Sequence, residues 1–223
     1  MPEETAPAFE QAFETLRQFT RSRRKSSRAV EHCELCSMGL AQEHPHLVEL
    51  ASRHILCACD ACAMLFDGME KAKYKRVARR AEYLANFEIT DAQWESLFIP
   101  INMAFFSYSS LEGKVIALYP SPAGAVESLL PLDAWKEVTE SNPALKRMRP
   151  DIEALLVNRV GHSRGLTSAE YYIAPIDECY KLVGLIRANW KGLSGGTEVW
   201  AEIGNFFSRL RAGADVITGE PNA

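Results

Sequence analysis

The cysteine-rich stretch Cys33-Glu-Leu-Cys36, followed twenty residues later by Cys57-Ala-Cys59-Asp-Ala-Cys62, decides how the first part of this chain folds. Each Cys-x2-Cys turn presents two sulfurs on one side of a tight loop, and the residues between the turns are enough for a hairpin that brings the second turn back to the first. Four thiolates placed in this way bind a metal ion tetrahedrally. We therefore predict a metal site whose ligands are Cys33, Cys36, Cys59 and Cys62.

Three further residues near the two turns are alternative ligands. Residues 53–59 are predicted to form a short strand entering the second turn, which would place Cys57 and Cys59 on the same face. Cys57 can then replace another thiol as a ligand, contact the ligands without binding the metal, or be an ordinary buried thiol. His44 and His46 lie between the two turns, and an imidazole can replace a thiolate. The sequence leaves these roles open.

The predicted cofactor is one zinc ion, with one mononuclear iron ion as the alternative. Four thiolates suit both metals, so the spacing of the sulfurs does not separate them. Rubredoxin-like turns usually carry a glycine soon after their second cysteine; Ser37-Met38-Gly39 matches this in part and Ala63-Met64-Leu65 does not. Closed four-thiolate sites are most often structural zinc sites, and zinc is therefore preferred.

The composition is that of an ordinary globular protein. The 223 residues are 47% hydrophobic and 24% charged, with a formal net charge of −4, which excludes a disordered chain and a strongly basic nucleic-acid coat. No run of about 18 apolar residues indicates a membrane span, and residues 1–8 lack the basic and then apolar pattern of a secretory signal. We expect a cytoplasmic protein that does not insert into membranes.

Changes in composition divide the chain into four segments. Residues 1–29 are predicted to form an N-terminal helix and a basic linker, and residues 30–80 form the Cys-rich metal-binding module. Residues 81–213 follow as an α+β domain, and residues 214–223 as a flexible tail.

The predicted fold class is α+β: a small zinc-ribbon or rubredoxin-like module, followed by an antiparallel sheet covered on one face by C-terminal helices. Apolar runs predict strands over residues 99–108, 114–119, 152–157 and 171–174. Capping residues and apolar spacing predict helices over residues 90–95, 133–139, 177–192 and 198–210.

Several longer phrases stand out in the second part of the chain. They are Tyr119-Pro-Ser-Pro-Ala-Gly124, Pro131-Leu-Asp-Ala-Trp135, Ala154-Leu-Leu-Val-Asn-Arg159, Pro175-Ile-Asp-Glu-Cys-Tyr180 and Leu193-Ser-Gly-Gly-Thr-Glu-Val-Trp200. With the cysteine pairs, they resemble a bacterial domain-of-unknown-function family associated with gene neighbourhoods of nickel–iron hydrogenases, notably the actinobacterial type. The resemblance implies an accessory role in hydrogenase maturation, assembly or electron transfer, with a hydrogenase subunit or maturation factor as the partner. It implies no catalytic residue.

Two other functions fit parts of the pattern. Basic runs at residues 21–28 and 71–80 flank the cysteines, and with His44 and His46 between the turns they suggest a treble-clef nucleic-acid module or an HNH-like nuclease. The acidic balance of the whole chain argues against a nucleic-acid partner. A thiol-redox protein using Cys57, Cys59 and Cys62 is the second alternative. Outside the cysteines no set of residues demands a reaction, so an enzyme is not expected.

Overall fold

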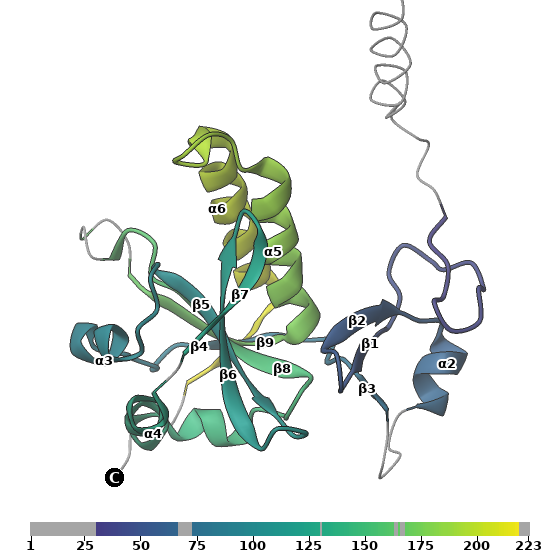
Figure 1. Cartoon of the computed structure of the whole chain (residues 1–223), viewed down its shortest axis with the longest axis horizontal. Helices are drawn as coiled ribbons and strands as arrows, with labels where there is room; N and C mark the ends of the chain where they lie inside the picture. Colours follow the sequence, from purple (N-terminus) through teal and green to yellow (C-terminus); the bar gives the residue numbers. More distant parts are fainter. Residues whose placement is uncertain (1–29, 67–72, 130, 163–164, 166–167, 219–223) are drawn as a thin grey trace, which may run out of the picture.

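The computed structural model describes residues 30–66, 73–129, 131–162, 165 and 168–218. The predicted N-terminal helix and basic linker lie outside these residues. The described part contains a small three-stranded sheet with the short helix α2 (Asp60–Leu65), and a larger seven-stranded sheet that carries the other described helices (Figure 1). The predicted α+β fold class is confirmed.

The small sheet has the strand order β2-β1-β3, and both pairs of strands are antiparallel. Its elements are β1 (His46–Glu49), β2 (His54–Cys57), the helix α2 (Asp60–Leu65) and β3 (Tyr74–Arg76). Strands β1 and β2 form a hairpin whose turn holds Arg53 at a φ of 58°. The strand predicted over residues 53–59 is thus shorter, because the backbone leaves the sheet after Cys57 to begin α2.

The large sheet has the strand order β10-β4-β9-β8-β5-β6-β7, and its neighbours are antiparallel except for β10 and β4. Its strands are β4 (Glu82–Leu84), β5 (Met103–Ser109), β6 (Lys114–Ser121), β7 (Gly124–Ser128), β8 (Glu153–Asn158), β9 (Glu170–Pro175) and β10 (Asp215–Ile217). The central strands β5, β8 and β9 contain continuous apolar runs, at residues 103–106, 154–157 and 171–174, and are almost wholly buried. Such runs, unlike alternating ones, are typical of a sheet covered on both faces.

Helices cover both faces of the large sheet, so the prediction of one covered face is wrong. On one face lie α5 (Ile176–Asn189) and α6 (Gly196–Gly213), side by side in Figure 1. On the other face lie α3 (Asp91–Ser96), α4 (Leu132–Ser141) and the 3-10 helix η1 (Pro143–Arg147). The short helices cover this face through two large side chains: Trp135 stacks on Phe106 with ring centroids 4.9 Å apart, and Trp94 meets the same ring edge-on.

Buried Arg159 fixes the segment before α3 to the large sheet. One guanidinium nitrogen donates to the Ile89 carbonyl at 2.6 Å and to the Tyr171 hydroxyl at 3.3 Å, and another pairs with Asp91. The predicted capping residues then begin α3, because the Thr90 hydroxyl accepts from the Gln93 backbone N–H at 3.2 Å.

In the large sheet, the sequence did not indicate the short strands β4, β7 and β10. Residues 215–217, assigned to the tail from the sequence, pair in parallel with β4, beginning with the Asp215 N–H bonded to the Ala81 carbonyl at 3.0 Å. A three-residue strand at a sheet edge has too few side chains to show an apolar period. Its partner strand, far away in the sequence, determines that it forms.

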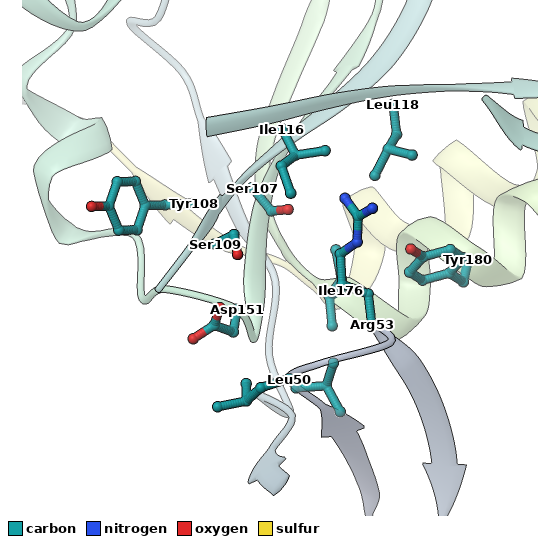
Figure 2. Close-up of a pocket in the computed structure, with 11 residues that line it drawn as sticks. Leu50, Arg53, Ser107, Tyr108, Ser109, Ile116, Leu118, Asp151, Ile176 and Tyr180 are labelled. Atoms are coloured by element: carbon teal, nitrogen blue, oxygen red, sulfur yellow. The ribbon is translucent and has the colours of Figure 1, made fainter. Parts of the chain in front are cut away.

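The small sheet packs against the α5 side of the large sheet. Apolar residues Val48, Leu50, Ile55 and Val77 join the core beneath α5. An ion pair also joins the two sheets: Arg53 Nη2, in the β1–β2 turn, lies 3.1 Å from Glu127 Oε2, in β7. Figure 2 shows the Arg53 side chain reaching from the hairpin turn toward Leu118 and Tyr180, beside a cavity of about 20 Å³.

Asp151 ties the small sheet to the large one through a compact polar network. Its buried carboxylate accepts from Lys75 Nζ at 2.5 Å, from Ser110 Oγ at 2.6 Å and from the Ser110 backbone N–H at 2.8 Å. Its backbone has a φ of 71°, a conformation that Asp and Asn tolerate better than most residues. Asp151 therefore contributes both a turn conformation and a buried charge.

We expect Asp151→Asn to lower the free energy of unfolding by about 2 kcal/mol, because the amide keeps the turn but loses the charge that Lys75 pairs with. Urea unfolding should show a lower midpoint with an unchanged slope. The control Glu112→Gln removes an exposed pair with Lys114 and should change stability by less than about 0.5 kcal/mol. Equal effects of both variants would contradict the role given to Asp151.

Candidate metal centre

Two tight turns bring four cysteine sulfurs together at one end of the small sheet. The Sγ atoms of Cys33, Cys36, Cys59 and Cys62 all lie within 4.8 Å of one another. The Sγ atoms of Cys36 and Cys59 lie 3.7 Å apart. An ideal tetrahedron with metal–sulfur bonds of about 2.3 Å places its sulfurs about 3.8 Å apart. The donor set therefore fits a tetrahedral thiolate-binding ion, and these four cysteines can hold one.

Backbone hydrogen bonds produce this convergence. The Ser37 N–H bonds to the Cys33 carbonyl at 2.7 Å, and Ser37 closes the first turn at a φ of 61°. In the second turn, Cys59 is the N-cap of α2, and its sulfur accepts the Cys62 backbone N–H at 3.4 Å. A helix N-terminus thus supplies a donor to a sulfur, which stabilises negative charge there.

Glu34 and Cys57 lock the two turns together. The Glu34 N–H bonds to the Cys57 carbonyl at 2.9 Å, and the Cys57 N–H bonds to a Glu34 carboxylate oxygen at 2.9 Å. The site also forms the small core of this region: Cys33 and Cys59 are buried with Leu47, Ala58 and Ala63. Two of the four candidate ligands therefore belong to the core of the small sheet, and Cys62 packs against it.

The thiols of Cys33, Cys36 and Cys62 differ in how readily they ionise. Burial raises the pKa of Cys33, but the backbone N–H groups of Cys59 and Leu35 stabilise its thiolate more strongly and lower the pKa to about 6. Contact with the Cys59 sulfur raises the pKa of Cys62 to about 12. The Met38 backbone N–H lowers the pKa of Cys36, but contacts of the Cys36 thiol with Cys33 and Cys59 raise this pKa overall. Without a cation, one thiolate therefore keeps protons on its neighbours.

Cys57 belongs to a different group. One ligand atom from each of His44, His46 and Cys57 lies within 4.8 Å of the others, and this group excludes the four clustered cysteines. The expectation that Cys57 and Cys59 share a strand face is wrong, because the strand ends at Cys57 and Cys59 already caps α2. The redox hypothesis placed Cys57 with Cys59 and Cys62; the structure places it with the two histidines.

Comparison with known proteins gives a family but no activity. A family model described as a family of unknown function (DUF5947) matches residues 32–214. The chain belongs to this family. No curated protein and no solved structure matches it. The predicted resemblance to a domain-of-unknown-function family is confirmed at this level, and the link to hydrogenases stays a prediction.

In this DUF5947 chain, the sixth cysteine takes no part in either group. Cys179 lies on α5 and is fully buried in the core, as its place in an apolar helix predicts, and burial raises its pKa well above the usual range.

None of the described helices has the length and apolar character needed to cross a membrane.

Asp177 is the site residue that sequence reasoning missed in the DUF5947 chain. The sequence indicated only a charge at the start of a helix, whereas the structure places its Oδ2 atom 2.7 Å from His46 Nδ1. The two residues are 131 positions apart. No local pattern could have shown this contact, because it depends on the packing of the small sheet against α5.

Proposed function

We propose that this protein binds one zinc ion through Cys33, Cys36, Cys59 and Cys62, and that the ion holds the small sheet in its folded form. The convergence of the four sulfurs within 4.8 Å carries the proposal. The small sheet has few buried apolar residues of its own, and such small regions usually need a metal or a disulfide. Zinc bound by four thiolates has no open position and supplies structure rather than catalysis.

Elemental analysis and a visible spectrum test the choice of metal. Protein purified aerobically without chelators should contain zinc in the four-cysteine site and be colourless, because zinc has a filled d shell. An iron tetrathiolate would absorb visible light and bleach with dithionite. Coloured, bleachable protein with stoichiometric iron would overturn zinc and favour a one-electron relay.

We further propose that the folded small sheet presents a surface for protein docking in nickel–iron hydrogenase maturation or assembly. The resemblance carried by the long sequence phrases supports the hydrogenase link. In a host with both genes, deletion should lower hydrogenase activity, and the wild-type gene should restore it better than a Cys33→Ser variant. Unchanged hydrogenase activity after deletion would contradict this role.

Ion pairing of the second basic run favours a protein partner over a nucleic acid. Four of its described cations face a carboxylate: Lys73 with Glu49, Lys75 with Asp151, Arg79 with Asp60, and Arg80 with Asp215. Cations held in this way are less available to phosphates. DNA binding should then be absent even at low salt, where phosphate contacts are strongest.

A further inference from the structure

We propose that His44, His46 and Cys57 form a second metal site, separate from the four-cysteine site, that binds a divalent ion of the Zn²⁺ type and leaves one coordination position open. This goes beyond the structural zinc ion, since neither site shares a ligand with the other.

The β1–β2 hairpin places the three donors together. His46 and Cys57 are paired directly across the two strands, so their side chains lie on the same face about 5 Å apart at Cβ. His44 is two residues before His46, on the segment that enters β1, and its ring lies 4.9 Å from the His46 ring. The structure brings one ligand atom from each residue to within 4.8 Å of the others.

Hydrogen bonds orient both imidazoles as ligands. His46 Nδ1 lies 2.7 Å from the Asp177 carboxylate, and His44 Nδ1 lies 2.9 Å from the Ala41 carbonyl. An oxygen that accepts from Nδ1–H leaves Nε2 with its lone pair free, and metal-binding histidines are usually held in this way. Asp177 thus positions His46 from the large sheet, and Ala41 positions His44 from its own loop.

The Nε2 atom of His44 lacks a partner, and a metal ion would supply one. This atom is buried without a hydrogen-bond partner, and only 7% of the side chain is exposed. The Oε2 atom of the Glu31 carboxylate lies 3.7 Å away, beyond hydrogen-bond reach. Buried polar atoms rarely lack a partner, and an orphan nitrogen beside a thiol and a second imidazole points to a cation.

An adjoining cleft gives the proposed site an open side. The cleft has a volume of about 670 Å³, and His44, His46, Cys57 and Asp177 are among its lining residues. Two imidazoles and one thiolate are three protein donors, the number found in zinc sites that keep a fourth position for water or another ligand. The four-cysteine site has no such position. The second ion should therefore exchange and accept small ligands, whereas the first should not.

Zinc stoichiometry tests the second site. With excess Zn²⁺ and after gel filtration, the wild-type chain should hold two ions, whereas Cys57→Ser and His44→Gln should each hold one. The matched control His54→Gln changes an exposed histidine of β2 outside the group and should hold two. Circular dichroism of each variant checks that it is folded. If Cys33→Ser loses both ions, the loss of the second ion is explained by unfolding of the small sheet and does not test the second site.

Cobalt tests the open position. With Co²⁺ in both sites, added imidazole should shift the visible spectrum of wild type and leave that of Cys57→Ser unchanged. One zinc ion in the wild type that Cys57→Ser retains, or two ions in folded His44→Gln, would overturn the second site. Two ions with no response to imidazole would overturn the open position. Failure of the four-cysteine site is distinguishable, because it would leave one zinc ion that Cys57→Ser removes.

Discussion

A chain carrying Cys33→Ser is expected to lose the ion of the four-cysteine site and most of the structure of its small sheet. Cys33 is 1% exposed, lies in the core of that sheet, and has a thiol whose pKa is lowered to about 6. Structural zinc contributes about 10–16 kcal/mol to the folding of isolated zinc-finger peptides at neutral pH. Because Val48, Leu50 and Ile55 also pack on the large sheet, we expect a smaller loss here, about 3–5 kcal/mol.

Hydrogen exchange locates this effect. Amides of residues 33–62 should exchange much faster in Cys33→Ser, whereas those of β8, β9 and α5 should keep most of their protection, because the core of the large sheet contains none of the four cysteines. The control Cys57→Ser should keep the four-cysteine ion and its protection. Stoichiometric metal in that site of Cys33→Ser would show that the ligand set is wrong.

Local patterns in the sequence predicted much of the large sheet. The apolar runs that became β5, β6, β8 and β9 are long enough to be recognised, and the apolar stripes of α5 and α6 have a clear helical period. The second covered face was missed for a physical reason. Helices α3 and α4 bury few positions, but Trp94 and Trp135 each cover an area that several smaller residues would need.

The spacing of the cysteines predicted which four sulfurs converge, because each Cys-x2-Cys turn is a local structure. It did not predict that Cys57 would separate from them. That separation follows from one backbone event, the end of β2 at Cys57 and the start of α2 directly after Cys59. Contacts between distant segments, such as His46 with Asp177, leave no trace in a single sequence.

Metal binding to the four-cysteine site is expected to weaken steeply as the pH falls. At neutral pH the metal-free chain carries protons on Cys62, whose pKa is about 12, and on Cys36, whose pKa is also raised. Cys33, with a pKa of about 6, is already mostly ionised. Because the ligands must be thiolates, binding releases at least these two protons. Two protons correspond to an apparent Kd that rises about 100-fold for each pH unit lost between about pH 8 and 7.

Competition with a chromophoric chelator, using Cys57→Ser so that only one site is filled, measures this slope. At fixed free zinc well above the apparent Kd, a 100-fold loss of affinity lowers the stabilisation by about 2.7 kcal/mol, so the melting temperature should fall over the same pH range. The sign follows from competition: acid adds protons to Cys36 and Cys62, and those protons displace the metal. A Kd that changes only about tenfold per pH unit would mean that only one proton leaves, and that Cys36 or Cys62 is not a ligand.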